Sequence, residues 1–163
     1  MKLEIRSASD QDVPDLVDLT LRAFIPIFES FPKILGAEIY RRIWPDWRAC
    51  QAGAVEAFCE AHEEHTVLVA DVDGNAVGFV VYDLDDKTKT GTVQLIAVHP
   101  GYQNRGIGTG LSEAAAKEMS ERGMTLAQVE TGGDVSHAPA RRAYEKAGYT
   151  GLPLVRYFKT LKD

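Results

Sequence analysis

The feature that most constrains this chain is a glycine-rich loop that follows an apolar, β-branched stretch and precedes an alanine-rich helical segment. The loop reads Val98-His-Pro-Gly-Tyr-Gln-Asn-Arg-Gly-Ile-Gly-Thr-Gly110. Gly106, Gly108 and Gly110 open the backbone to close approach by a ligand, and a helix that begins near Gly108 presents unpaired N–H groups and the positive end of its dipole. The sequence therefore predicts a phosphate site between a strand and a helix.

Two familiar phosphate-binding loops do not fit this spacing. In a P-loop the last glycine is followed by Lys-Ser/Thr, whereas Gly106 is followed by Ile107 and Gly108. The dinucleotide fingerprint has its third glycine three positions after the second, where this chain has Leu111, and too little chain follows for the rest of that fold. The spacing therefore excludes a nucleoside triphosphatase and a dinucleotide-dependent enzyme.

A third signature does fit. The segment Gln103-Asn-Arg-Gly-Ile-Gly108 matches the Gln/Arg-x-x-Gly-x-Gly/Ala signature of the GCN5-related N-acetyltransferase (GNAT) superfamily. The second motif of that superfamily, Asn-x-x-Ala-x-x-x-Tyr-Glu-x-x-Gly-Phe, is matched by His137-Ala-Pro-Ala-Arg-Arg-Ala-Tyr-Glu-Lys-Ala-Gly-Tyr149, in which His137 replaces the common asparagine. The chain therefore resembles this superfamily from Thr66 to Phe158.

Length, charge and the amino-terminal sequence limit the partners. The 163 residues predict a single domain, 1–163, and a hydrophobic content of 45% is enough for a full core. A net charge of -6 argues against a nucleic-acid partner. Residues 1–6 contain no apolar signal core, and no stretch reaches the roughly 20 apolar residues that cross a bilayer, so we expect a cytoplasmic protein with no membrane partner.

Hydrophobic periodicity predicts the order of the elements. The expected elements are a strand at 3–5, a helix at 9–24, an interruption by two prolines at 25–32, a helical region at 34–61 broken at Pro45, strands at 67–70 and 77–82, a mobile loop at 83–91, a strand at 92–98, a helix ended by Gly123, a strand at 125–131, a helix ended by Gly148 and a last strand around 154–160. The resemblance implies an α/β fold (α+β in some schemes), with a mixed, twisted sheet of six to seven strands, helices on both faces and two splayed parallel strands.

The resemblance also implies acetyl coenzyme A as co-substrate, held in the wedge between the strands at 92–98 and 125–131. The pantetheine amides would pair with main-chain groups of Ile96 and Val98 as an added strand does. Main-chain N–H groups from 103–108 would bind the pyrophosphate, with Arg105 supplying charge. The expected binding residues are Ile96, Val98, Gln103, Asn104, Arg105, Gly106, Ile107, Gly108, Thr109, His137 and Tyr144, and no metal is expected.

Acyl transfer from a thioester to an amine needs a neutral amine, a donor for the tetrahedral oxyanion and a proton for the departing thiolate. Tyr144 matches the family tyrosine that lies beside the sulfur, so the resemblance assigns it the general-acid role. By the same resemblance, the N–H of Val98 is the expected oxyanion donor.

The general base is harder to assign. The strand position where some relatives carry a glutamate holds Thr92. Glu130, near the carboxyl end of the second wedge strand, is the candidate catalytic base, and its alternative is a solvated charge at a loop edge. Asp134 and His137 are further candidates, although the position of His137 favours contact with the co-substrate over a titrating role.

The acceptor is left open, because its pocket would come from the first helices and the loop at 83–91. The aromatic residues there either line an acceptor pocket or form core or dimer contacts, and near-helical spacing favours the latter; they are Phe24, Phe28, Phe31, Tyr40, Trp44 and Trp47. The sequence thus predicts an acetyl-coenzyme-A-dependent N-acetyltransferase that acts on a primary amine of a small molecule, peptide or protein. The alternative is a non-catalytic acyl-coenzyme-A sensor or regulatory module, and a homodimer is an expectation from resemblance.

Overall fold

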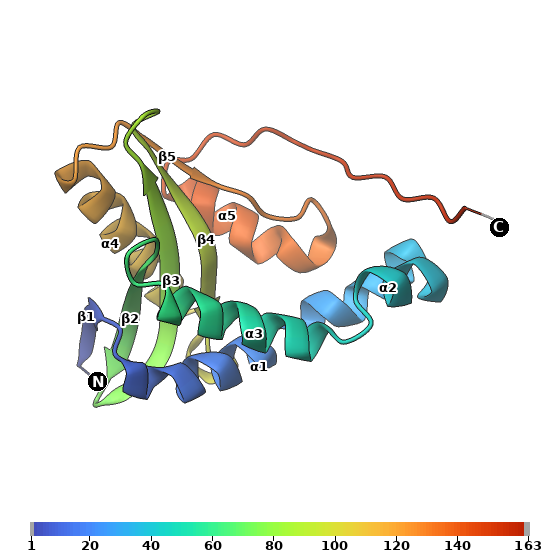
Figure 1. Ribbon diagram of the computed structural model, residues 1–163, viewed down its shortest axis with the longest axis horizontal. Helices are drawn as coiled ribbons and strands as arrows, with labels where there is room; N and C mark the ends of the chain where they lie inside the picture. Colours follow the sequence, from blue (N-terminus) through green and yellow to red (C-terminus); the bar gives the residue numbers. More distant parts are fainter. Residues whose placement is uncertain (1, 162–163) are drawn as a thin grey trace.

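The computed structural model describes residues 2–161, and within this range five strands form one mixed sheet with helices on both faces (Figure 1). The strands are β1 (Leu3–Ser7), β2 (Thr66–Val72), β3 (Asn75–Asp85), β4 (Thr90–Val98) and β5 (Leu126–Val129), in that order across the sheet. Neighbouring strands from β1 to β4 are antiparallel, whereas β4 and β5 are parallel. The predicted α/β class is confirmed, with five strands in place of the expected six to seven.

The helices are α1 (Val13–Leu35), α2 (Ala37–Ile43), α3 (Trp47–Glu60), α4 (Ile107–Glu121) and α5 (Ala138–Lys146). The break predicted at Pro45 is confirmed, because Trp44, Pro45 and Asp46 separate α2 from α3. Of the helices in residues 2–161, none has the length and apolar content to span a membrane.

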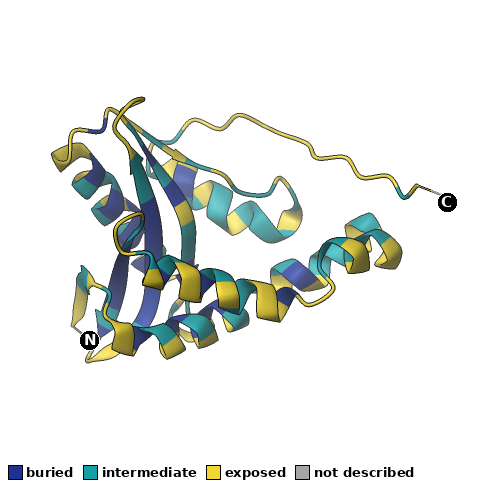
Figure 2. Cartoon of the chain, in the orientation of Figure 1, coloured by how far each residue is buried: buried dark blue, intermediate teal, exposed yellow. Residues whose placement is uncertain are grey.

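Two cores lie on opposite faces of the sheet (Figure 2). On one face Val80 and Tyr82 of β3 pack with Leu111 and other residues of α4. On the other face Phe79 and Val81 pack with residues of α1 and α3. Since side chains of a strand alternate between faces, β3 is buried on both sides and anchors the sheet.

The interruption expected at 25–32 does not occur, because α1 continues through Pro26 and Pro32. A proline inside a helix removes one backbone hydrogen bond and costs about 3 kcal/mol. The buried face of α1, which includes Leu16, Leu19 and Phe28, offsets this cost, since each buried side chain of this size contributes about 1.5–3 kcal/mol. Tertiary packing therefore overrides the local helix-breaking signal.

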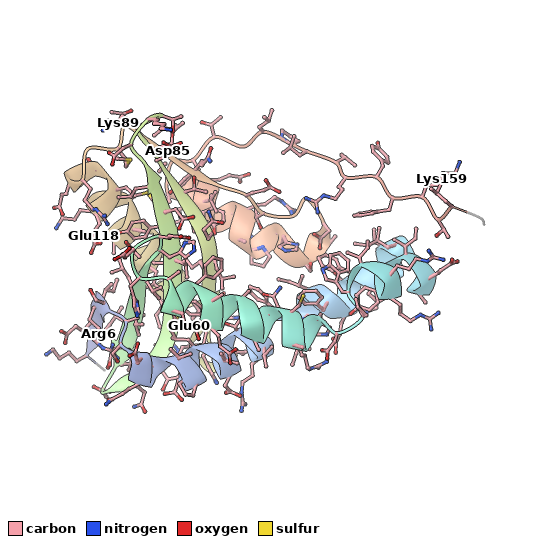
Figure 3. The ribbon with its side chains drawn as sticks, viewed as in Figure 1. Arg6, Glu60, Asp85, Lys89, Glu118 and Lys159 are labelled. Atoms are coloured by element: carbon pink, nitrogen blue, oxygen red, sulfur yellow. The ribbon has the colours of Figure 1, made fainter. Side chains whose placement is uncertain are left out.

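The expected mobile loop at 83–91 is also corrected. Strands β3 and β4 continue into it, and only residues 86–89 form the turn. Oδ1 of Asp85 accepts hydrogen bonds from the N–H groups of Lys87 at 2.8 Å and Thr88 at 3.3 Å, and Lys89 adopts a positive φ of 54°. Figure 3 shows Asp85 and Lys89 at this end of the sheet.

The strand expected around 154–160 does not form. Residues 149–161 leave the sheet and run past α5 toward α2, where Phe158, Lys159, Thr160 and Leu161 lie beside Ile39, Arg42 and Ile43 (Figures 1 and 3). The apolar side chains of Leu154, Val155 and Tyr157 are exposed. A strand needs a neighbour to pair with its backbone, and none is present for this segment within residues 2–161.

Candidate active site

The site is built where the two parallel strands part. The pairing of β4 with β5 runs from Thr90 opposite Leu126 to Val93 opposite Val129, and β5 ends there. Strand β4 continues to Val98, so Gln94 to Val98 form a strand edge beyond the last β5 pair (Figure 1). This is the splayed pair of parallel strands that the resemblance implies, and β5 is shorter than the expected 125–131.

A β-bulge marks the point of divergence. Val81 and Tyr82 are adjacent on β3 and lie opposite Leu95 and Val93, so Gln94 is an extra residue on β4. The bulge changes the alternation of side chains, because Val93 belongs to the core under α4 whereas Ala97 belongs to the core under α1 and α3. Beyond the bulge, the side chains of β4 therefore point to the opposite face of the sheet from the one that unbroken alternation would give.

The backbone of the edge points toward the gap at two positions. The N–H of His99 donates to the carbonyl of Val77 at 2.8 Å, which makes Val98 opposite Gly78 a pair without mutual hydrogen bonds. The main-chain N–H and C=O of Val98, and by alternation those of Ile96, therefore face away from β3 toward the gap. The carbonyl of Val98 accepts a hydrogen bond from Nε2 of Gln103 at 3.0 Å.

The glycine loop leads into α4. Asn104 has a φ of 61°, and Gly106, the N-cap residue, has a φ of 78° in the left-handed region that favours glycine. The first intrahelical bond of this turn runs from the N–H of Gly110 to the carbonyl of Gly106 at 2.9 Å. Gly106 has no side chain to cap the helix, so the N–H groups of the first turn are available to an anion.

The helix is held firmly beneath this turn. Ile107 and Leu111 are buried against the sheet, and a methyl group at Gly108 would meet only Cγ2 of Val98, at 3.7 Å. Arg105 is exposed, with Cζ 5.2 Å from the ring centroid of Tyr102. The loop thus combines a rigid helix start with a cation beside it.

Tyr144 lies on the buried face of α5. Burial, and secondarily the nearby Tyr149, raise the pKa of its phenol to about 12. The two rings meet edge to face at 5.7 Å between centroids. Tyr144 therefore stays protonated across the neutral range, as a proton donor must.

His137 is tied to the loop before α5 by a polar cluster. Its Nδ1 lies 2.5 Å from Oδ1 of Asp134, and Oδ2 of Asp134 accepts the hydroxyl of Ser136. Burial alone would raise the pKa of Asp134, but the hydrogen bonds from Ser136 and His137 outweigh it and hold the pKa below its ordinary value. The carboxylate is thus charged and orients the imidazole.

The pattern of the sequence missed two residues that support this cluster. Arg141 of α5 donates to the carbonyls of Gly132 at 2.6 Å and Asp134 at 2.7 Å. Gly132 leaves the space in which His137 and Asp134 meet. The consecutive glycines at 132 and 133 were the signal for a close approach in this loop.

The two carboxylates that are candidates for the general base lie in different surroundings. Glu130 directly follows β5 and is exposed, without a hydrogen bond or ion pair to the described residues. Asp134 is occupied by Ser136 and His137. No cluster of three or more potential metal ligands occurs among residues 2–161.

The aromatic residues of the first helices pack mainly on one another. Phe28 stacks on Trp47 at 4.4 Å and both are buried, so the core interpretation holds for this pair. Phe31 stacks on Trp44 at 4.6 Å and also lies 6.0 Å from the ring of His137. The cluster therefore connects the end of α1 to the loop before α5, although the two are more than 100 residues apart in sequence.

Comparisons with known proteins agree with this geometry. The model of the Acetyltransferase (GNAT) family matches residues 36–149. An N-alpha-acetyltransferase of Sulfurisphaera tokodaii is 32% identical over 105 residues, which are 58% of this chain and 62% of that protein. An uncharacterized N-acetyltransferase of Methanocaldococcus jannaschii is 24% identical over 93% of this chain and 62% of its own length. The chain thus spans about three fifths of these relatives.

Solved structures share the fold at low identity. A GNAT-family protein from Desulfovibrio desulfuricans superposes with a TM-score of 0.74 at 21% identity, covering 96% of this chain and 91% of that one. The ribosomal-protein-S18-alanine N-acetyltransferase of Escherichia coli gives a TM-score of 0.69 at 20% identity, covering 93% and 80%. With the family model matching most of its length, the chain belongs to the Acetyltransferase (GNAT) family.

Proposed function

We propose that this chain is an N-acetyltransferase that transfers the acetyl group of acetyl coenzyme A to a primary amine. One observation carries the proposal: the unpaired edge of β4 leads directly into the uncapped amino terminus of α4. An extended chain with amides along it and a pyrophosphate at its end fits both features. Acetyl coenzyme A has that chemistry, and it supplies an acyl thioester.

The residues of the wedge have distinct roles in this reaction. The main-chain groups of Ile96 and Val98 would bind the pantetheine amides. Gln103, Asn104, Arg105 and the first turn of α4, from Ile107 to Thr109, would bind the pyrophosphate. Tyr144 would donate its proton to the departing thiolate, since its pKa of about 12 keeps the phenol neutral before transfer.

His137 takes the place of an asparagine in the binding motif. Its Nδ1 is engaged by Asp134, so Nε2 is the nitrogen that would contact the co-substrate. Glu130 stays a predicted proton acceptor at the end of β5. Both assignments are tested by His137→Asn and Glu130→Gln in the assay below.

The acceptor we propose is the α-amino group of a peptide or protein. Two of the proteins similar to this chain act on such amines by name, the Sulfurisphaera tokodaii N-alpha-acetyltransferase and the Escherichia coli ribosomal-protein-S18-alanine N-acetyltransferase. A primary amine of a small molecule is the second candidate, because the aromatic cluster of α1 and α2 offers flat apolar surface near His137.

The test is thiol release from acetyl coenzyme A with a panel of peptides that differ in their first residue and a panel of small amines. Tyr144→Phe should lower kcat by about 100-fold while the calorimetric Kd for coenzyme A changes by less than twofold. Tyr157→Phe, at an exposed tyrosine, is the matched control and should match the wild type. Binding without turnover on every acceptor would instead favour a sensor or regulatory module, and absence of binding would refute both.

We also propose that two copies associate through their carboxyl-terminal segments. Leu152, Leu154 and Val155 are exposed on a segment that lies extended, and the outer edge of β5 pairs with no strand in residues 2–161. A partner's segment could supply that pairing. Light scattering should give a dimer for the wild type and a monomer for Leu154→Asp; a monomeric wild type would contradict the proposal.

A further inference from the structure

A row of polar side chains crosses the α1/α3 face of the sheet at the level where β4 and β5 part. At β5, Nε2 of Gln128 donates to Oγ1 of Thr92 at 2.9 Å. At β3, Oδ2 of Asp83 accepts from Nε2 of Gln94 at 2.6 Å, and Oδ1 of Asp83 contacts Nδ1 of His65. These five residues, which come from three strands and the turn before β2, are termed the polar row.

Strand register fixes the face on which the row lies. Asp83 is opposite Thr92, and the preceding Tyr82 belongs to the core under α4, so alternation directs Asp83 to the other face. Phe58 of α3, which packs on the second core, meets the ring of His65 edge to face at 4.9 Å. The row therefore shares its face with α1 and α3.

The acceptor would approach the wedge from the α1/α3 face of the sheet. The glycine loop leads into α4, which packs on the opposite face, so the proposed pyrophosphate site lies on the α4 side of the wedge. An amine that reaches the thioester from the other side of the sheet must pass the α1/α3 face. Gln94, the bulged residue next to the last β4–β5 pair, lies where the two approaches meet.

The row is sheltered at one end and open at the other. The side chains of His65 and Asp83 are only 19% and 29% exposed, whereas Gln94 and Gln128 are exposed. Partial burial of an ionisable pair costs desolvation free energy, which an ordinary surface ion pair avoids. This sheltered His–Asp pair is linked to the mouth of the wedge by the amide of Gln94.

We propose that the His65–Asp83 pair accepts the proton that the acceptor ammonium must lose before it attacks. This inference rests on the proposed acetyl transfer and names its proton acceptor. Asp83 holds Nδ1–H of His65, which leaves Nε2 as the basic nitrogen. Water hydrogen-bonded to Gln94 would carry the proton from the amine to this pair.

An acceptor R–NH3⁺ loses two protons as the amide forms. One proton passes from the ammonium through water to the His65–Asp83 pair, and the neutral amine nitrogen attacks the thioester carbonyl carbon. The C–N bond forms, the C–S bond breaks, and Tyr144 protonates the thiolate. Tyr144 recovers a proton from the attacking nitrogen as the amide forms, and His65 releases its proton to bulk water.

Other charged groups surround the pair. Arg122, the residue after α4, donates to Oγ1 of Thr66, which directly follows His65, at 3.2 Å. Glu63 and Glu64 are exposed in the turn that leads to His65, while Phe58 and Gln94, which contact the pair from α3 and β4, are uncharged. Asp83 is the charged side chain in direct contact with His65.

The experiment measures kcat and KM for thiol release from acetyl coenzyme A between pH 6 and pH 10, with an alanyl-peptide and with any amine acetylated in the panel above. At pH 6.5, His65→Gln and Asp83→Asn should each lower kcat by about 100-fold. The loss should shrink toward pH 10, where the amine is already deprotonated in solution, and imidazole should partly restore His65→Gln. The Kd for coenzyme A should stay within twofold.

His62→Gln is the matched control, because His62 lies in the same turn and makes an exposed contact with Asp10 at 3.6 Å. Gln94→Leu, at an exposed position, should lower kcat about tenfold even if the pair variants fold poorly. Wild-type activity that survives within threefold in His65→Gln and Asp83→Asn at every pH overturns the proposal. So does a pH-dependent loss confined to Glu130→Gln. An inactive wild type refutes the acetyl transfer itself, which is a separate outcome.

Discussion

Gly132 lies so close to His137 that a methyl group on Gly132 would overlap Nδ1 of the imidazole. The same methyl group would come within 2.5 Å of Oδ1 of Asp134. The contact between His137 and Asp134 therefore requires glycine at position 132, for reasons of space. This relationship connects the loop after β5 to the N-cap residue of α5.

Gly132→Ala should separate His137 from Asp134 and weaken coenzyme A binding about tenfold, which is about 1.4 kcal/mol. Isothermal titration calorimetry provides the measurement. Gly133→Ala is the matched control, because a methyl group there would meet only the carbonyl oxygen of Leu154, at 3.9 Å. Equal affinity in both variants would show that the orientation of His137 does not matter for binding.

Arg105→Ala should weaken coenzyme A binding about tenfold without abolishing it, because the main-chain N–H groups of the first turn of α4 are retained. The difference from the wild type should decrease as salt is added. Titrations at low and high ionic strength measure it. Lys117→Ala removes a cation from the far half of α4 and should bind like the wild type; an equal loss in that variant would point to net charge in place of a local contact.

Asp12 contributes a pH-dependent part of the stability. Hydrogen bonds from Arg6, opposed by burial, lower the pKa of Asp12 from 3.8 to about 2. Because the folded pKa lies below the unfolded one, this stabilisation is present above about pH 4 and is lost as the pH falls to about 2. Asp12→Asn should lower the free energy of unfolding by about 2 kcal/mol at pH 7 and by little at pH 2.

Urea unfolding across this pH range measures the effect. Asp18→Asn is the control, since Asp18 forms an exposed ion pair with Arg22 one turn along α1. Its effect should stay below about 0.5 kcal/mol. A constant deficit of Asp12→Asn at all pH values would assign the role of Asp12 to its hydrogen bond with Ser9 at the start of η1 (Asp10–Asp12).

Tyr149→Phe should stabilise the chain by about 1 kcal/mol, because the buried Tyr149 hydroxyl has no hydrogen-bond partner among the described residues. Thermal unfolding without ligand measures the change. Tyr157→Phe, at an exposed tyrosine, should leave the melting temperature unchanged. A less stable Tyr149→Phe would indicate that the hydroxyl is satisfied in solution.

Local sequence patterns predicted most of the strands and helices. Alternation located β2 to β4, and the break at Pro45 separates α2 from α3 as expected. The interruption predicted from the prolines of α1 is wrong, because burial of the apolar face of α1 against β3 and α3 outweighs their helix-breaking effect. The expected last strand failed for a related reason, since strand pairing is a property of two segments and this segment has no neighbour in the described chain.

By itself, the sequence determined the family and the phosphate-binding end of the site, because the glycine loop, the helix after it and the Tyr144 motif are read within short segments. The arrangement at the other end of the site, away from the phosphate-binding loop, was decided by the tertiary structure alone. The contact of His65 with Asp83, the bulge at Gln94 and the approach of Phe31 to His137 join distant segments. Such contacts depend on strand register and helix packing, which minimise the free energy of the whole chain and leave no local pattern.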